Sequence, residues 1–90
     1  MSSIAPEEFQ TLLDQHYQWP AEYLFKFVVK AEDLAQLETI FEDTIILEKT
    51  KRDSRGAKYI ALSVRAQMDS SDEVIAIYES ASEIEGLTAL

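Results

Sequence analysis

The chain has 90 residues with no cysteine, and its 17 acidic and 8 basic side chains give a net charge of −9 at pH 7. A chain of this length predicts one domain that folds without disulfides, and the lack of cysteine excludes thiolate metal sites and thiol catalysis. The negative charge argues against nucleic acid as a partner, because phosphate groups require a positive surface.

The first predicted element is a helix from Pro6 to Tyr17. Proline suits the first turn of a helix, and the carboxylates of Glu7 and Glu8 complement the positive end of the helix dipole. Pro20 ends this segment. The residues with the spacing of one helix face are Phe9, Leu12, Leu13 and His16.

Residues 21–30 alternate in the manner of a strand, and residues 31–43 then change to the helical period. The strand has large side chains on one side, namely Tyr23, Phe25, Phe27 and Val29. The helix has an apolar face formed by Leu34, Leu37, Ile40 and Phe41. Both segments therefore offer one apolar face to a common core.

A hairpin is predicted from two strand-like runs, residues 45–52 and 57–68, joined by a turn that ends at Gly56. Gly56 supplies a position with positive φ. We expect Arg52 to face Ala57, which would place Leu47 opposite Leu62 and Ile45 opposite Val64. In this register the apolar residues of both strands share one side of the sheet.

The last third of the chain predicts a helix followed by a short strand, residues 87–90. Ser70 and Glu73 have the spacing of a capping box at the start of this helix. The acidic run 69–73 lacks the glycine and the terminal ligand of a calcium loop, so we interpret it as helix capping. The predicted buried face of the helix comprises Val74, Ile77, Tyr78 and Ala81.

The order of elements after the first helix is βαββαβ, which predicts an α+β fold of the ferredoxin-like type. This fold is a four-stranded antiparallel sheet with two helices on one face and with the first and third strands central. We divide the chain into an N-terminal helical extension, residues 1–18, and a single domain, residues 19–90. The other sheet face would be open and partly apolar. We expect the extension to cover that face, or two copies to associate through the face or a sheet edge.

The open face is predicted to carry nine residues, namely Leu24, Lys26, Val28, Ile46, Thr50, Tyr59, Ala61, Ser63 and Arg65.

Two stretches of the chain carry a family resemblance: Trp19 and Pro20 followed by the residues 23–27, and the run from Ser54 to Ile60. They resemble the YbeD-like family of small uncharacterised bacterial proteins, some of which are labelled putative lipoate regulatory proteins. The resemblance implies a ferredoxin-like domain similar to ACT-type regulatory domains. The chain has one residue more than the family pattern between Gly56 and Tyr59, which predicts a longer turn or a bulge there. It also has Ala61 where the family often has serine.

The strongest candidate site is the basic hairpin, whose five cations are Lys49, Lys51, Arg52, Arg55 and Lys58. Such a cluster can bind an anionic ligand or an acidic partner surface. Alternatively, these charges protect an edge strand from pairing with other molecules, or offset the acidic remainder of the chain. The sequence leaves both interpretations open.

A second candidate is a small-anion site on the open sheet face, formed by Lys26, Tyr59 and Arg65. The alternative is that these cations pair with carboxylates such as Glu48. His16 is the only histidine, which argues against a metal cluster or a histidine-based catalytic relay. We therefore expect no cofactor, no metal and no enzymatic activity.

Two functions follow as hypotheses: a small non-enzymatic regulatory or protein-interaction module, or an ACT-like sensor of a small anionic metabolite. No segment approaches the ~20 apolar residues of a membrane span, and the N-terminus lacks a signal-peptide pattern. We therefore expect a cytoplasmic protein without a membrane partner. A lipoate-related role is implied by the family label alone.

Overall fold

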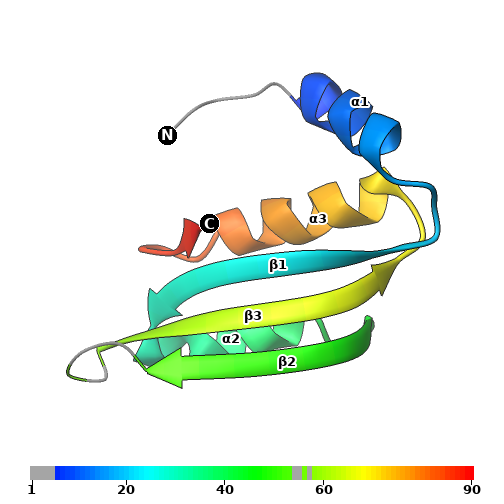
Figure 1. Cartoon of the computed structure of the whole chain (residues 1–90). Helices are drawn as coiled ribbons and strands as arrows, with labels where there is room; N and C mark the ends of the chain where they lie inside the picture. The colour runs from blue at the N-terminus through cyan, green and yellow to red at the C-terminus, as the bar shows by residue number, and fades with distance from the viewer. Residues whose placement is uncertain (1–5, 54–55, 57) are drawn as a thin grey trace.

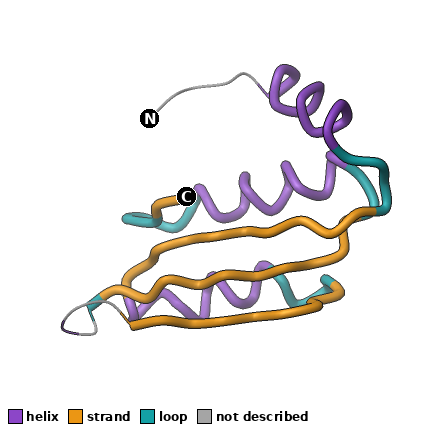
Figure 2. The backbone as a smooth tube through the Cα atoms, in the orientation of Figure 1, coloured by secondary structure: helices purple, strands orange, loops and turns teal. Residues whose placement is uncertain are grey.

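A computed structural model describes residues 6–53, 56 and 58–90 of the chain. Figure 1 shows an α+β arrangement in which three helices accompany one sheet, and Figure 2 traces the same path by secondary structure. The elements are α1 (Pro6–His16), β1 (Ala21–Lys30), the 3-10 helix η1 (Ala31–Asp33), α2 (Leu34–Ile40), β2 (Ile45–Asp53), β3 (Tyr59–Met68), α3 (Ser71–Ser82) and β4 (Thr88–Ala89).

The sheet has four strands in the order β2-β3-β1-β4, and every neighbouring pair is antiparallel. The prediction that the first and third strands are central is confirmed. β1 and β3 pair along their whole length, from Ala21 opposite Met68 to Lys30 opposite Tyr59. β4 is shorter than expected, because only Thr88 and Ala89 pair with β1.

One sheet face forms the core with the helices. Strand β1 buries every second residue, as predicted from its alternation, and β3 does the same. Their buried side chains join those of α2 and α3 in one apolar cluster, which includes Phe25, Phe27, Leu62, Val64, Leu37, Val74 and Ile77. The opposite face of β1 and β3 is exposed or half-buried.

The N-terminal helix does not cover the open sheet face, so that expectation is wrong. α1 packs against α3 on the helical side of the molecule (Figure 1). Leu13 is buried in the same core. The rings of Phe9 and Tyr78 contact edge-on with their centroids 5.7 Å apart, and the Gln10 side-chain amide donates a hydrogen bond to the Asp72 carboxylate. The apolar stripe of α1 thus extends the helical layer.

The predicted hairpin register is also wrong. Arg52 pairs with Ala61, so Leu62 faces Lys51 and Val64 faces Lys49. The connection between the strands spans residues 54–58, which is longer than the predicted turn. Ala57, the expected partner of Arg52, lies outside the described residues, whereas Gly56 has the predicted positive φ of 76°. All nine residues of β2 are exposed, so β2 does not contribute to the buried core. Leu62 is therefore buried without an apolar partner from β2.

The hairpin has a bulge in β2, whereas the longer turn or bulge predicted between Gly56 and Tyr59 involves Ala57, which lies outside the described residues. Ile46 pairs with Ala66 and Glu48 pairs with Arg65, which leaves Leu47 as an extra residue in a β-bulge. The prediction that Ile46 lies on the open face is wrong. Ile46 pairs with Ala66, which belongs to the buried, helix-covered face. Ile45 takes its place on the open side, opposite Gln67.

The helix predicted over 31–43 is shorter, since the structure has η1 and α2 over residues 31–40. α2 ends at Ile40, so the carboxylates of Glu42 and Asp43 lie beyond the negative end of its dipole. The cap of α3 is confirmed, because the Ser70 hydroxyl accepts from the Glu73 N–H at 3.3 Å. The Glu73 carboxylate accepts from the Asp69 N–H at 2.9 Å.

Candidate interaction surface

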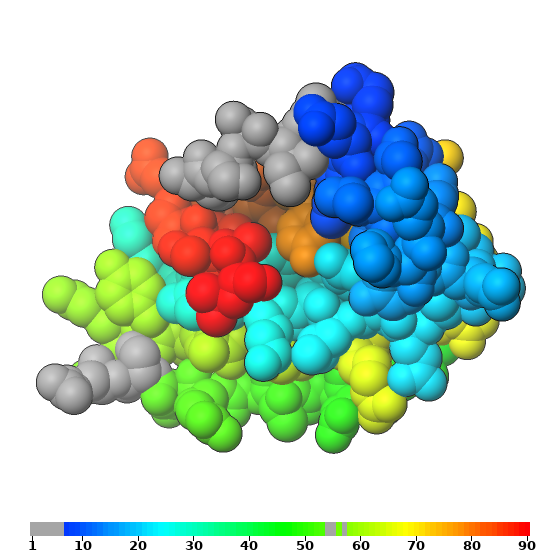
Figure 3. Space-filling view, turned by 45° about the horizontal axis from the view of Figure 1, so that its top comes forward, coloured from blue at the N-terminus to red at the C-terminus, as the bar shows by residue number. Residues whose placement is uncertain are grey.

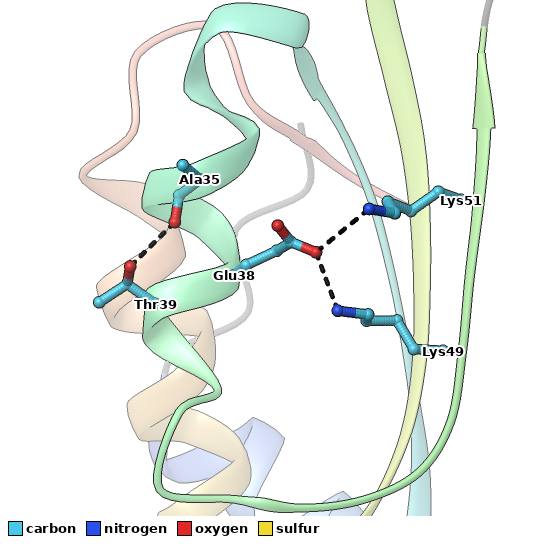
Figure 4. Close-up of polar contacts among 5 residues, drawn as sticks. All are labelled: Ala35, Glu38, Thr39, Lys49 and Lys51. Atoms are coloured by element: carbon cyan, nitrogen blue, oxygen red, sulfur yellow. Dashed lines mark hydrogen bonds and ion pairs between the residues drawn. The ribbon is translucent and has the colours of Figure 1, made fainter.

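Two of the hairpin cations are held by a helix. The Nζ atoms of Lys49 and Lys51 lie 2.9 Å and 3.6 Å from Oε2 of Glu38 in α2 (Figure 4). The hydrogen bond from Lys49 is the main cause that lowers the pKa of the Glu38 carboxyl below its usual range. The two lysines therefore connect the edge strand to the helical layer.

This arrangement separates the predicted basic hairpin site into two parts. Lys49 and Lys51 lie opposite the buried Val64 and Leu62, on the side of the sheet that the helices cover. Arg52 points to the opposite, open side, and Lys58 is exposed in the connection that precedes β3. Arg55 lies outside the described residues. The described cations of the hairpin thus do not converge on one ligand.

Arg65, which belongs to the second predicted site, is engaged on the open face. Its Nη1 lies 2.9 Å from Oε1 of Glu22, and its Nη2 lies 3.1 Å from Oε1 of Glu48. The hydrogen bond with Glu22 is the main cause that raises the pKa of the Arg65 guanidinium. The alternative that this cation pairs with carboxylates is confirmed, and the ion pairs link β1, β3 and β2 across the sheet.

The other two residues of the second site lie apart from Arg65. Tyr59 faces Lys30 near one end of the sheet, and Arg65 is six residues further along the same strand. A rise of about 3.3 Å per residue separates their backbones by about 20 Å. Lys26 lies between them, opposite Ser63. One small anion therefore does not reach all three residues.

The open face instead has a depression with a volume of ≈ 360 Å³. Its lining includes Arg52 from the predicted hairpin site and Lys26 from the second predicted site. Lys26 of β1 faces Ser63, which faces Thr50 of β2; in the next row Arg52 faces Ala61. These five residues line the depression together with Phe27, Lys51, Leu62 and Leu90. Within the part of the chain that the structure describes, neither Lys26 nor Arg52 has an ion-pair partner.

Two unpaired cations beside two hydroxyl groups are suited to bind an anionic group through charge-assisted hydrogen bonds. The sequence singled out Lys26 and Arg52 as candidate site residues, whereas it placed Thr50 and Ser63 on the open face without assigning them to a site. Thr50 and Ser63 lie opposite each other only in the observed register of β2 and β3. The predicted register therefore did not indicate that these two hydroxyls belong to one site. No group of three or more histidine, cysteine or carboxylate side chains suited to a metal ion occurs among residues 6–53, 56 and 58–90.

The fold and this surface define a small α+β protein with an open-faced antiparallel sheet and, on its free side, a depression lined by the cations Lys26 and Arg52. The chain belongs to the family described as protein of unknown function (DUF493), which matches residues 14–90. Neither the curated proteins nor the solved structures include a match. No helix among the described residues is long and apolar enough to cross a membrane.

Proposed function

We propose that this chain is a small non-enzymatic regulatory module that binds an acidic surface of a protein partner through the open face of its sheet. The observation that carries the proposal is the division of the cations. Lys49, Lys51 and Arg65 are engaged in ion pairs, whereas Lys26 and Arg52 flank a depression without ion-pair partners in the described chain.

The composition of the open face supports a protein partner. Leu24 is 50% exposed beside the ion-paired Arg65, so the face offers apolar area next to charge. Interfaces combine such apolar contacts with polar groups that set orientation. The partner contributes carboxylates that replace the water around Lys26 and Arg52. Two copies joined face to face would bring Lys26 and Arg52 of one copy toward the same cations of the other, which argues against self-association as the main use of this face.

We infer further that the fold is ferredoxin-like and the chain YbeD-like, with central first and third strands and edge second and fourth strands in support. The regulatory part of the proposal rests on the likeness to ACT-type domains. A cytoplasmic location is part of the proposal, and the absence of cysteine supports it. No residue of the depression suggests lipoate chemistry.

A second candidate function is an ACT-like sensor of a small anionic metabolite. The same depression favours it, because its lining residues, which come mainly from β1, β2 and β3, surround a volume suited to a carboxylate or phosphate group. The two functions differ in the size of the ligand. A sensor is stabilised by a free metabolite, whereas an interaction module requires the surface of a partner.

The test of the first proposal is capture from a cell lysate with the immobilised full chain, followed by mass spectrometry. The double variant Lys26→Gln/Arg52→Gln should lose the captured protein. The matched control Lys49→Gln/Lys58→Gln removes the same charge from residues that do not line the depression and should retain it. Equal capture by both double variants, or loss in the control alone, would contradict the proposal.

The test of the sensor is a thermal-shift screen of anionic metabolites. A ligand at a hundred times its dissociation constant stabilises the folded chain by about 2.7 kcal/mol. The stabilisation should disappear in Lys26→Gln/Arg52→Gln and persist in the control. A screen without any stabilising compound counts against the sensor and leaves the interaction module as the function to pursue.

A further inference from the structure

The central strand β1 has an open edge over half of its length. On one side β3 pairs with all ten of its residues, but on the other side β4 pairs only with Phe27 and Val28. The last backbone contact on that side is the Leu90 N–H, which donates to the Lys26 carbonyl at 2.9 Å. From Ala21 to Phe25, no described strand lies beside this edge.

The contact of Leu90 shows which backbone groups this edge presents. Successive residues of a strand direct their N–H and C=O groups to opposite neighbours. Since the Lys26 carbonyl points to the β4 side, the backbone groups of Leu24 and Glu22 point the same way. Both residues are exposed, and their backbones make no hydrogen bond to the described loops or termini. The edge therefore offers two donors and two acceptors in strand geometry.

An apolar groove lies next to this edge. It has a volume of ≈ 540 Å³ and is lined by Phe9, Leu12, Leu13, His16, Tyr17 and Tyr23. Tyr23 belongs to the open part of β1, and the other five belong to α1 and the residue that follows it. In the space-filling view, β1 (cyan) is visible between α1 (blue) and the C-terminal residues (red), as Figure 3 shows. Leu12 in this groove is 42% exposed.

The helix that forms most of the groove is acidic. α1 carries Glu7, Glu8 and Asp14, and residues 6–25 contain no lysine or arginine. None of these three carboxylates has an ion-pair partner in the described chain; Asp14 accepts a hydrogen bond from the Trp19 indole at 2.8 Å. A segment that enters the groove therefore gains from positive charge.

We propose that the open edge of β1 from Ala21 to Phe25 binds an extended segment of a partner protein as an added strand, and that this segment combines alternating apolar residues with basic ones. Its backbone pairs with Glu22 and Leu24. Its apolar side chains, on every second residue, fill the groove beside α1, and its basic residues meet the carboxylates of that helix. Backbone pairing supplies affinity and the groove supplies selectivity, as in other cases of strand addition.

This site is separate from the depression at Lys26 and Arg52 and binds a partner of the opposite charge. β2, at the other edge of the sheet, is less suited to strand addition. Its bulge at Leu47 interrupts regular pairing, and Lys49 and Lys51 place charge along it. Between Ala21 and Phe25, β1 pairs with β3 without a bulge, and its one charged residue, Glu22, is paired with Arg65 on the open sheet face.

The experiment is a selection of random displayed peptides, each roughly 5 to 6 residues long as is usual for a strand, on the immobilised full chain. Enriched peptides are then synthesised and titrated into the isotope-labelled chain. At saturation, the amide hydrogens of Glu22 and Leu24 should exchange at least tenfold more slowly than in the free chain. A copy of each peptide with proline at its centre should bind at least tenfold more weakly, because proline removes a backbone donor.

Two variants test whether the peptide binds at the groove beside β1 or at the edge of β2. Leu12→Asp changes an exposed groove residue and should weaken binding at least tenfold, whereas Leu47→Asp makes the same change on the exposed β2 edge and should leave it within twofold. The proposal is overturned by a selection that enriches no peptide with apolar alternation and basic residues, or by protection of β2 amides in place of those of β1. Equal binding of the proline copies, or an assembly of the chain with itself through this edge, also overturns it.

Discussion

The hydroxyl oxygens of Tyr23 and Tyr78 lie 3.0 Å apart and join the central strand β1 to helix α3. Both rings belong to the aromatic group that connects α1, β1 and α3, since Phe9 and Phe25 also contact Tyr78. We expect Tyr78→Phe to lower the free energy of unfolding by about 1 kcal/mol, because the half-buried Tyr23 hydroxyl then lacks its partner. Urea denaturation measures this loss. In Tyr23→Phe/Tyr78→Phe the losses should be less than additive; full additivity would contradict the pairing.

The same tyrosines predict a dependence of stability on alkaline pH. Burial is the main cause that raises the pKa of both the Tyr23 and the Tyr78 hydroxyl above the ordinary value of 10.0. The unfolded chain ionises at that ordinary value while the folded chain resists ionisation. The stabilisation is therefore complete below pH 10.0 and decreases as the pH rises above it. Tyrosinate absorbance should show that, at a pH at which the unfolded chain has ionised its four tyrosines, the folded chain has ionised fewer of them. Ordinary titration of all four would contradict the burial argument.

Glu38 predicts a small loss of stability in acid. Its hydrogen bond with Lys49 lowers its pKa below the ordinary value of 4.5, so the contribution is present above that value and is lost as the pH falls through the lowered pKa. Glu38→Gln should cost about 0.5 kcal/mol at neutral pH, the size usual for exposed ion pairs. Thermal melts of the variant and of the control Glu42→Gln, which lies outside the described ion pairs, provide the measurement. An equal loss in both variants would show that Glu38 has no special role.

Leu13 and Leu12 are neighbours in α1 but differ in their surroundings. Leu13 is 4% exposed within the core, and Leu12 is 42% exposed. Leu13→Ala should lower the free energy of unfolding by about 3 kcal/mol because it leaves a cavity, whereas Leu12→Ala should change it by no more than about 0.5 kcal/mol. Chemical denaturation of both variants tests whether α1 belongs to the core. An unchanged stability of Leu13→Ala would mean that the helix packs only loosely.

The sequence predicted the central part of the fold because its signals there are strong. Alternation in β1 comes from Phe25, Phe27 and Val29, which are all buried against the helices. The capping box at Ser70 is local and needs no knowledge of the tertiary structure. In both cases the pattern in the chain and the packing in space favour the same structure.

The register of the hairpin was not predictable by the same argument. β2 is an edge strand whose nine residues are all exposed, so apolar alternation does not determine its alignment with β3. Lys49 and Lys51 occupy the helix-covered side because Glu38, eleven residues before Lys49, lies within reach. This long-range ion pair has no signature in the local sequence.

The candidate site shows the same limit. Composition indicated which cations to consider, but only the positions of Glu22, Glu38 and Glu48 separate the paired cations from the unpaired ones. Arg65 and Lys26 look equivalent in the sequence. In the structure, Arg65 is engaged by two carboxylates and Lys26 borders a depression.

The proposal that Lys26 and Arg52 form the recognition site is tested most directly by the dissociation constant of the captured partner, measured by calorimetry. Loss of two charge-assisted contacts at about 1.5 kcal/mol each predicts a weakening of roughly a hundredfold in Lys26→Gln/Arg52→Gln. The control Lys49→Gln/Lys58→Gln should bind within about twofold of the unmodified chain, since neither lysine lines the depression. A partner that binds Lys26→Gln/Arg52→Gln as tightly as the unmodified chain would contradict the account.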